Sequence, residues 1–471
     1  MQSGIEPYEL LAELCHRADG VNGGRAGSAL VMAPRHRFLC ENSTVGAGIP
    51  IACGAAMAAV AQGSDRVVVV SFGDGATSQE ALREGLVLAA ARRLPVLFIC
   101  ENNSWSEMTP VSEMVPLDRI AWSAGWYGIR GFTIDGTDPL AVRDTAALAV
   151  AGLRAGLAAR PEVLVCGEEV GKAGGIFAAT RSLQREFGAD RVFDMPIAES
   201  AILGSAVGAA MCGQRPDVEI MWADFLLVAL GQLINQAANV RYLTRDRFSA
   251  PLVVRTQHGA TPGSCAQHSQ SLEALLAHIP GLCVGLPTTP QDVYDMLRAA
   301  VADPDPCIIE SRALHQTKAS VTLAATPGPV GSAALRVSGR DVALVGWGAV
   351  MAQLLEASRQ LGQDVIEAAV LDLRWFSPFD DAALSAAVMG CHSRAVIAHD
   401  ANLTGGFGAE IAARLHEQHG PGAIQICRVA SPDIRVPAAP LLQRASLPDA
   451  AAVVRAAKSL VPARVLEAEP V

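Results

Sequence analysis

The chain contains no pair of cysteines at CxxC spacing and no apolar run long enough to cross a bilayer. Its eleven cysteines are scattered singly, as at Cys53, Cys100 and Cys166, which is typical of reduced thiols in a cytosolic protein. The amino terminus, MQSGIEPYELLAEL, lacks the basic start and apolar core of a signal peptide. The apolar stretch 49–61 is short and rich in Gly and Ala. We therefore expect a cytoplasmic protein with no membrane insertion.

Positive charge is also scarce. The chain has 37 Lys and Arg residues against 47 Asp and Glu, which gives a net charge of −10. Because binding to nucleic-acid phosphates requires a basic face, this balance argues against a nucleic-acid partner. It does not exclude a small anionic substrate, which needs only a few local cations. At 471 residues the chain is too long for one hydrophobic core, so two to four domains are expected.

Short apolar segments alternate with Ala-rich helical segments throughout, a pattern typical of parallel sheets covered by helices. Boundaries are expected near residues 158–161 and within the loose segment 317–339. A faint internal repeat relates STVGAGIPIACGAAMAA, from Ser43, to AESAILGSAVGAAMCG, from Ala198. Chance similarity between Ala-rich helices is the alternative explanation. Strands are expected at Val67–Phe72, Val96–Cys100, Val163–Gly167, Leu252–Arg255, Val342–Gly346, Val365–Asp372 and Ala395–Asp400.

Two successive strands end in polar side chains with oxygen atoms. The first leads into Gly73-Asp74-Gly75 and the second into Glu101-Asn102-Asn103. Since ligands of open parallel sheets lie beyond the carboxyl ends of the strands, Asp74 and Asn103 are expected to lie close together. A carboxylate and an amide carbonyl are suitable ligands for Mg²⁺ or Ca²⁺.

The two glycines and the following helix suggest what the metal would accompany. Gly73 and Gly75 let the backbone approach a phosphate. The helix expected from Ser78 onward would direct its positive amino end at the same place. The pattern therefore predicts a metal–diphosphate site. A plain strand-to-helix turn, with an unrelated asparagine turn, is the alternative that either motif alone would favour.

The combination GDG…NN is the signature of thiamine-diphosphate enzymes, and the segment EALREGLVLAAARRLPVLFICENNSWSEMTP resembles the alpha half of the decarboxylating first component of 2-oxoacid dehydrogenase complexes. The resemblance implies that Mg²⁺ is held by Asp74, Asn103 and the main-chain carbonyl of Trp105. It also implies that the cofactor contacts the backbone of Val45 at its aminopyrimidine, and Gly75 and Ala76 at its diphosphate.

From Glu162 onward the chain resembles the beta half of the same component, through EVLVCGEEVGKAGGIFAATRSLQREFGADRVFDMPIAESAILGSAVGAAM, EIMWADF and AQHSQS. The resemblance, which extends from about Ile5 to Val461, therefore suggests an alpha–beta fusion. In this family the residue matching Glu199 pairs with the cofactor's aminopyrimidine, a role that suits a buried carboxyl sharing a proton with a ring nitrogen.

Two further residues of the beta-like half are assigned by the resemblance. Phe225 matches an aromatic residue that packs on the aminopyrimidine, although a plain core phenylalanine is the alternative. His268, in AQHSQS, matches the family's catalytic histidine near the substrate carboxylate. An imidazole suits this role because it can both neutralise a carboxylate and relay protons near pH 7. His258 is the second candidate for that role.

Two other motifs are set aside. The segment Gly405–Glu410, GGFGAE, follows a strand and opens a helix as a dinucleotide fingerprint does, but its third glycine is missing. We interpret it as a tight turn. The segment Asp135–Asp138, DGTD, is interpreted as a turn, with a metal loop as the alternative.

The expected fold is α/β, with two doubly wound thiamine-diphosphate-binding domains followed by a transketolase-like carboxyl-terminal domain. We place the alpha-like diphosphate and metal domain at residues 1–158, the beta-like pyrimidine domain at 159–325 and the carboxyl-terminal domain at 338–471. The family architecture implies a homodimer of this fused chain. Its substrate would be a small 2-oxo acid.

The sequence departs from the family in three places. No counterpart exists for the family's amino-terminal diphosphate-binding segment. The loop containing HGHS is absent between Gly156 and the next strand, and Leu30 stands where the family has a histidine. Arg35 and Arg37 are candidates to balance the diphosphate charge, although an exposed basic loop is the favoured explanation for them. A separate partner subunit could also supply the missing segment.

These departures leave three functions to compare. The first is decarboxylation of a 2-oxo acid with transfer of the resulting acyl or enamine unit to a lipoyl-bearing acyltransferase, as in dehydrogenase complexes. The second is a stand-alone carboligase that joins the same unit to a second carbonyl compound, giving an acyloin. The third is an inactive scaffold paralogue, which retention of Asp74, Asn103, Glu199 and His268 argues against.

Overall fold

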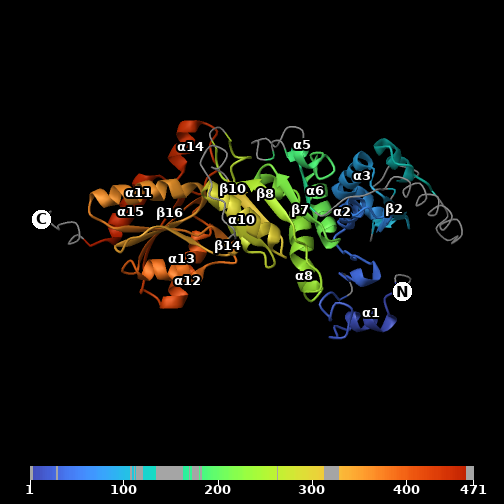
Figure 1. Cartoon of the computed structure of the whole chain (residues 1–471), viewed down its shortest axis with the longest axis horizontal. Helices are drawn as coiled ribbons and strands as arrows, with labels where there is room; N and C mark the ends of the chain where they lie inside the picture. The colour runs from blue at the N-terminus through green and yellow to red at the C-terminus, as the bar shows by residue number, and fades with distance from the viewer. Residues whose placement is uncertain are drawn as a thin grey trace. The chain divides into compact units, whose positions relative to one another are not determined.

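The computed structural model describes residues 4–27, 30–106, 109–110, 112, 120–133, 163–168, 170–171, 180, 183–261, 264–311 and 328–462 (Figure 1). The chain divides into two compact units. The first consists of Met1–Glu219, Leu226–Val253 and Pro304–Pro306, and the second of Ile220–Phe225, Val254–Asp303 and Cys307–Val471. The three domain ranges expected from the sequence stay a prediction. The predicted turn at Asp135–Asp138 lies outside the described residues.

The amino-terminal part of the first unit is built on the parallel strands β1 (Val68–Gly73) and β2 (Val96–Glu101). The helices α2 (Gly48–Ala61) and α3 (Glu80–Arg92) pack on this pair, and Ile49, Leu82 and Leu86 form the buried core between them. Both strands lie within one residue of their expected ranges. The other elements of this part are α1 (Pro7–Leu14), η1 (Pro34–His36), η2 (Asp74–Ser78), β3 (Trp105–Ser106), β4 (Thr109–Pro110) and η4 (Ile120–Tyr127).

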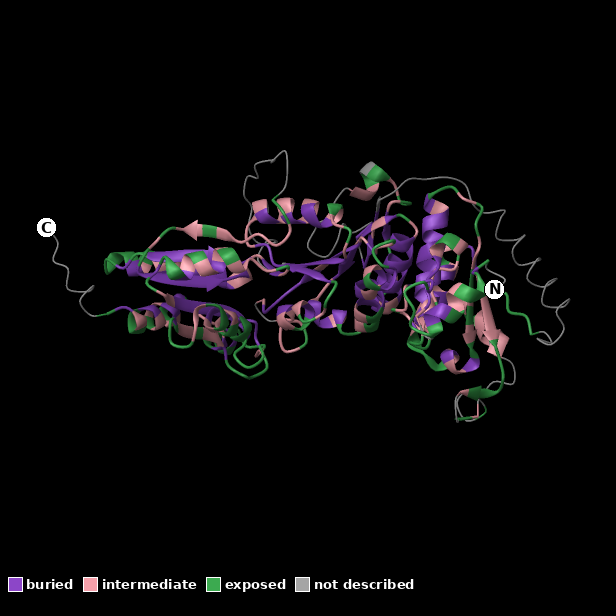
Figure 2. Ribbon diagram, turned by 90° about the horizontal axis from the view of Figure 1, so that it is seen from below, coloured by how far each residue is buried: buried purple, intermediate pink, exposed green. Residues whose placement is uncertain are grey.

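The helix α6 (Glu199–Met211) packs directly against α2, and both helices are almost wholly buried (Figure 2). Their backbones meet at glycines. A Cβ atom on Gly54 would lie 1.7 Å from the carbonyl oxygen of Ser205, and one on Gly208 would lie 1.9 Å from that of Ile51. These two helices are the two halves of the faint sequence repeat. The close contact between the two helices therefore explains why both segments of the repeat consist of small residues.

The rest of the first unit contains three parallel strands that lie side by side in the order β7-β5-β6. The strand β5 forms at its predicted position, Val163–Gly167. The remaining elements are α5 (Leu183–Phe187), β6 (Val192–Asp194), β7 (Arg215–Ile220), η5 (Gln232–Gln236), η6 (Ala237–Asn239) and α8 (Val240–Leu243). The last residue of β7 and all of α7 (Ala223–Leu226) except Leu226 belong to the second unit.

The second unit contains four strands in the order β14-β9-β10-β8. The strands β9 and β10 are parallel, whereas β14 runs antiparallel to β9. These elements span β8 (Val253–Gln257), α9 (Glu273–Ala277), β9 (Cys283–Gly285), α10 (Pro290–Ala302), β10 (Cys307–Ser311) and β14 (Trp375–Ser377).

The carboxyl-terminal part is a five-stranded sheet of order β11-β13-β12-β15-β16, parallel except for β11. The helices α11 and α15 cover one face and α12 and α13 cover the other (Figure 1), which is the expected doubly wound arrangement. The elements are β11 (Ala334–Val337), β12 (Val342–Gly346), η7 (Gly348–Val350), α11 (Met351–Gln363), β13 (Ala368–Asp372), α12 (Asp381–Met389), β15 (Arg394–Asn402), α13 (Gly408–His419), β16 (Gln425–Ser431), α14 (Pro440–Ser446) and α15 (Ala450–Leu460).

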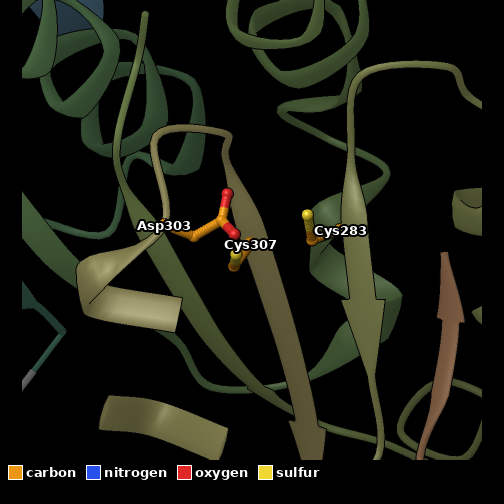
Figure 3. A group of neighbouring side chains, drawn as sticks. All are labelled: Cys283, Asp303 and Cys307. Atoms are coloured by element: carbon orange, nitrogen blue, oxygen red, sulfur yellow. The ribbon is translucent and has the colours of Figure 1, made fainter. Parts of the chain in front are cut away.

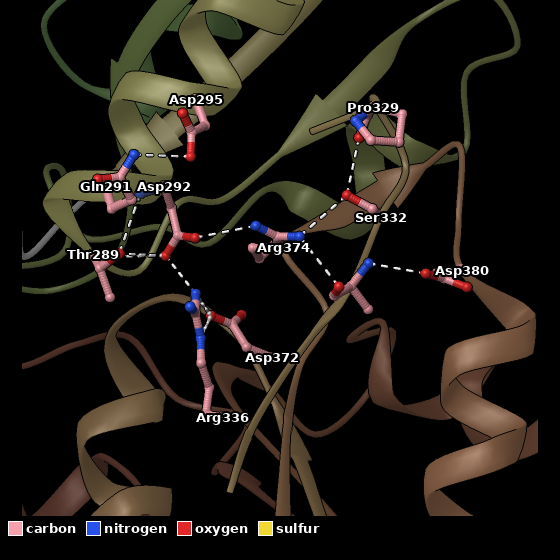
Figure 4. A network of polar contacts seen from close by, with 11 residues as sticks. Thr289, Gln291, Asp292, Asp295, Pro329, Ser332, Arg336, Asp372, Arg374 and Asp380 are labelled. Atoms are coloured by element: carbon pink, nitrogen blue, oxygen red, sulfur yellow. Dashed lines mark hydrogen bonds and ion pairs between the residues drawn. The ribbon is translucent and has the colours of Figure 1, made fainter. Parts of the chain in front are cut away.

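A polar network joins segments of the second unit that are far apart in the sequence (Figure 4). Asp292, which also caps α10 together with Thr289, forms ion pairs with Arg336 and Arg374. Arg336 in turn lies 2.8 Å from a carboxylate oxygen of Asp372. The network therefore ties α10 to the strands and loops that follow residue 328.

Two local expectations were refined by the structure. The strand expected from Val365 begins only at Ala368, because Val365 has a φ of 60° in the turn after α11. The GGFGAE segment forms the turn that leads into α13, where a Cβ on Gly406 or Gly408 would collide with His399 at 2.5 or 2.6 Å. Among the described residues, no helix is long and apolar enough to cross a membrane.

Candidate functional site

The structure brings the two predicted polar strand ends together. The strands β1 and β2 are in register with Gly73 opposite Glu101, so Asp74 and the Asn102-Asn103 pair follow neighbouring strands at the same edge. The side chain of Asp74 is 1% exposed, and its Oδ2 atom has no hydrogen-bond partner. A buried carboxylate oxygen without a partner is costly, and a cation would satisfy it.

Asn103 and Trp105 belong to an exposed turn beside Asp74. The Oδ1 atom of Asn103 accepts a hydrogen bond from the backbone N–H of Trp105 at 2.9 Å. Asn102 does the same for Ser104, which has a φ of 68°. These local bonds define the backbone path through Trp105. The assignment of Asn103 and the Trp105 carbonyl as metal ligands stays a prediction.

The two glycines around Asp74 differ in their surroundings. No atom lies within 4 Å of a Cβ built on Gly73, so the space beside it is open. A Cβ on Gly75 would lie 2.4 Å from the hydroxyl oxygen of Ser106. Gly75 is therefore required for packing against the following loop, whereas Gly73 keeps space free for a ligand. Ala76, next in the chain, is buried.

The helix expected from Ser78 begins later. Asp74–Ser78 forms a short 3₁₀ helix, in which the Thr77 hydroxyl donates to the Asp74 carbonyl at 2.6 Å. Gln79 then has a ψ of 141°, and α3 starts at Glu80. The expectation of a continuous helix from Ser78 was wrong, because the extended conformation of Gln79 separates the two helical segments. Val45 precedes α2 and is 56% exposed, so its backbone is accessible at the surface.

Glu199 is the first residue of α6 and is 9% exposed. The sequence analysis did not single out its neighbour Glu84, which lies on α3. The Oε2 atom of Glu84 accepts a hydrogen bond from the backbone N–H of Ala201 at 2.8 Å, so Glu84 caps the amino end of α6. Burial, together with the negative charges of Glu80 and Glu199, raises the pKa of Glu84 to about 7, although the hydrogen bond from Ala201 opposes the shift. Two carboxyl groups thus share the start of one helix.

In the second unit, Phe225 and His268 come together although they are far apart in the sequence. Their rings meet edge to face at a centroid distance of 5.3 Å, and Trp222 packs on His268 in the same way at 5.2 Å. The side chain of Gln270 donates to Asp224 at 3.0 Å, which ties the histidine loop to α7. His268 is partly exposed.

The second histidine candidate, His258, has a different environment. Its side chain is 1% exposed and lies among the carboxylates of Glu273, Glu310 and Asp400. Burial alone would lower the pKa of His258, but its contacts with Asp400 and Glu310 raise that pKa well above the usual value. Of the two histidines, His268 therefore suits contact with substrate, and His258 belongs to a separate buried cluster.

Arg35 was a candidate to balance the diphosphate charge. It forms an ion pair with Glu9, and both line an open cavity of about 490 Å³ with Asp19, Arg245 and Arg247. Since Arg35 already has a carboxylate partner, it is poorly suited to neutralise a diphosphate.

Comparison with known proteins places the chain in a class. Residues 1–161 match the family model of the dehydrogenase E1 component, residues 139–316 that of the transketolase pyrimidine binding domain, and residues 331–453 that of the transketolase C-terminal domain. The order and extent of these matches are those of an alpha–beta fusion.

Similar proteins define the class more closely. The chain is 38% identical over 290 residues to the 2-oxoisovalerate dehydrogenase subunit beta of Bacillus subtilis, covering 60% of this chain and 87% of that protein. It is 36% identical over 302 residues to the pyruvate dehydrogenase E1 component subunit beta of Leifsonia xyli, and the match covers 64% of this chain and 89% of that protein. It is 37% identical over 311 residues to the acetoin:2,6-dichlorophenolindophenol oxidoreductase subunit beta of Cupriavidus necator, and the match covers 63% of this chain and 91% of that protein.

The chain therefore belongs to the dehydrogenase E1 family, whose members are thiamine-diphosphate-dependent enzymes. A solved structure, that of a split-gene transketolase in an inactive beta4 tetramer, is similar with a TM-score of 0.53 at 23% identity, covering 64% of this chain and 92% of the other. That similarity supports the transketolase-like fold alone.

Proposed function

We propose that this chain decarboxylates a 2-oxo acid with thiamine diphosphate and Mg²⁺, and passes the product to a lipoyl-bearing acyltransferase. The observation that carries the proposal is the buried, unpartnered Oδ2 atom of Asp74, at the edge where β1 and β2 end and beside the open space at Gly73. This donor set fits a hard cation that bridges to a diphosphate. Asp74, Asn103 and the Trp105 carbonyl would hold the metal. Gly73, Gly75 and Ala76 would contact the diphosphate.

Thiamine diphosphate, when bound, would supply a nucleophilic carbon and a positively charged thiazolium ring that takes up the electron pair released as carbon dioxide leaves. The protein's part is positioning and proton transfer. Glu199 would share a proton with the aminopyrimidine ring nitrogen, while the Val45 backbone and the Phe225 ring orient that ring. The His268 imidazole would neutralise the substrate carboxylate and relay a proton. The beta-type relatives named after 2-oxo-acid dehydrogenases favour this activity over an inactive scaffold.

The acceptor distinguishes the proposed activity from acyloin formation. Purified protein is incubated with thiamine diphosphate, Mg²⁺ and a panel of linear and branched 2-oxo acids, with either a lipoyl domain or an aldehyde as acceptor. We expect carbon dioxide release and acyl-lipoyl product by mass spectrometry. Acyloin formed equally well in the presence of the lipoyl domain would favour the carboligase, and no turnover with any acid would overturn both.

The assembly and compartment are proposed from the same family relation. We propose a cytoplasmic homodimer of the fused chain, and the absence of a disulfide among its eleven cysteines, all of which lie in the described residues, suits a reducing compartment. Sedimentation equilibrium checks the assembly, and an active monomer would contradict it. A separate partner subunit that supplies further alpha segments would appear as a larger complex on purification from the native host.

A further inference from the structure

A group of buried ionisable side chains in the second unit lies around His258. The residue follows the end of β8, and three carboxylates from three other elements face its ring: Glu273 at the start of α9, Glu310 in β10 and Asp400 in β15. The side chains of His258, Glu273 and Glu310 are 1%, 0% and 0% exposed. The group is therefore shielded from water, and unpaired charge is most costly in such an interior position.

The contacts around the ring are close, yet several atoms make no hydrogen bond. Nδ1 of His258 lies 3.2 Å from Oε2 of Glu310 and 3.8 Å from Oε2 of Glu273. Nε2 lies 3.4 Å from Oδ1 of Asp400, within hydrogen-bond distance. The Nδ1 atom, the Glu273 Oε2 atom and both oxygens of Glu310 are buried without a hydrogen-bond partner. Each of the three residues therefore contributes at least one unpartnered polar atom to the same buried group.

We propose that His258, Glu273 and Glu310 bind one divalent transition-metal ion. Their ligand atoms lie within 4.8 Å of one another. Ligands bound to Zn²⁺ at their usual distances lie roughly 3.0–3.5 Å apart, so the observed separations of 3.2 and 3.8 Å require only small shifts. One imidazole with carboxylates is a donor set for Zn²⁺, Mn²⁺ or Fe²⁺, and it contains no soft sulfur ligand.

Asp400 and Trp347 complete the arrangement. If the Nε2–H group of His258 donates to Asp400, the lone pair of Nδ1 is directed at the two glutamates, and only a cation or a proton can lie between them. A histidine that binds a metal is held in this way, with its other ring nitrogen donating to a carboxylate. The indole N–H of Trp347 donates to Oε1 of Glu273 at 3.3 Å, which leaves Oε2 to face the metal.

The negative charge of the group must be balanced either by a cation or by protons. Three ionised carboxylates around a neutral imidazole would place three negative charges in the interior, and a divalent ion leaves only one of them unbalanced. The competing account is that protons fill this place, since burial raises the pKa of Glu273 to about 7. A cavity of about 80 Å³, lined by Ser271, Asp400 and Arg435 among others, lies on the Asp400 side of the group.

A second group in the same unit serves as an internal comparison. Cys283 in β9 and Cys307 in β10 are register partners, and Asp303 lies beside them (Figure 3). This group presents two sulfur atoms and a carboxylate, so a metal bound there has a different first coordination sphere. Its sulfur ligands make the two locations distinguishable by spectroscopy.

The test uses the full-length chain without thiamine diphosphate, carrying Asp74→Ala so that the diphosphate edge cannot hold metal. The protein is stripped with a chelator, loaded with Zn²⁺, dialysed and examined by elemental analysis and X-ray absorption. We expect about one zinc per chain, with nitrogen and oxygen neighbours at about 2.0–2.1 Å and the signature of an imidazole. A sulfur shell near 2.3 Å would assign the metal to the thiols and overturn the proposal.

Paired variants locate the ion. Glu310→Gln and Glu273→Gln keep side-chain size, and each should weaken zinc binding by at least about tenfold, whereas Cys283→Ser with Cys307→Ser should retain it. Zinc binding unchanged in Glu310→Gln would overturn the proposal. If the parent retains no zinc and Zn²⁺ does not raise its unfolding temperature, protons hold the cluster together and the proposal is wrong. Because this site shares no residue with the proposed reaction, the result is independent of catalysis.

Discussion

Glu199 and Glu84 show how one helix terminus can hold two carboxyl groups with different tasks. Glu84 accepts a hydrogen bond from the backbone N–H of Ala201, whereas Glu199 is the first residue of that helix. Glu84 therefore positions the start of α6, and the proposed proton-sharing role of Glu199 rests on its place in the first turn and on the family relation.

Glu199→Gln tests the proton-sharing role. The amide keeps the size of the side chain, so cofactor affinity should stay close to that of the parent. The exchange of the thiazolium carbon-bound proton with deuterium in bound cofactor, followed by NMR after rapid quenching, should slow on the order of a hundredfold or more. Asp74→Ala is the matched comparison, since cofactor binding itself should be lost there. Exchange at the parental rate in Glu199→Gln would show that the assignment is wrong.

Glu84→Gln tests the raised pKa of Glu84. A carboxyl whose pKa is about 7 in the folded protein holds its proton more tightly there than in the unfolded chain. Its contribution to stability is therefore present at low pH and is lost as the pH rises to about 7. In Glu84→Gln the free energy of unfolding should not show this decrease with rising pH, as measured by urea unfolding at several pH values. The exposed Glu417, changed to Gln, should leave the pH dependence intact, and a parental slope in Glu84→Gln would refute the assignment.

At the scale of the elements, strand positions followed from apolar runs bounded by glycine or proline, and the strands β5 and β12 formed at their predicted residues. Boundaries that depend on a single backbone conformation could not be predicted. Gln79 interrupts the helix after Asp74, and the positive φ of Val365 delays β13. The same limit applies to the site. Sequence motifs pointed to Asp74, but the capping bond of Glu84 depends on contact between two helices far apart in the sequence.

The contact between α2 and α6 makes a prediction about its glycines. In Gly208→Ala the new methyl group would lie about where the Ile51 carbonyl oxygen is, 1.9 Å away, so the helices must separate. Overpacking of this kind typically costs about 1–3 kcal/mol in the free energy of unfolding, which chemical denaturation measures. Gly362→Ala in α11 is the control, because nothing lies within 4 Å of its Cβ position. It should be neutral or stabilising by up to about 1 kcal/mol.

At the scale of the whole molecule, sequence patterns do not reveal which charged side chains of the second unit pair with one another. The pattern of strands and helices is local, whereas the ion pairs among Asp292, Arg336, Asp372 and Arg374 connect parts that lie tens of residues apart. Charged residues scattered along a sequence do not reveal their partners. Such long-range pairs explain why fold class was predictable here while the attachment of the carboxyl-terminal sheet was not.

Asp292→Ala tests how strongly this network stabilises the second unit. The variant removes the carboxylate that Arg374 and Arg336 share and one half of the capping box of α10, while Arg336 keeps Asp372. Because Asp292 is only 3% exposed, its loss leaves cationic groups in a partly buried place without full compensation. We expect the free energy of unfolding to fall by about 2–4 kcal/mol, measured by chemical denaturation. Glu356→Ala breaks an exposed ion pair with Arg359 on α11 and should change stability little. If the free energy of unfolding falls no more in Asp292→Ala than in this control, the network does not stabilise the second unit.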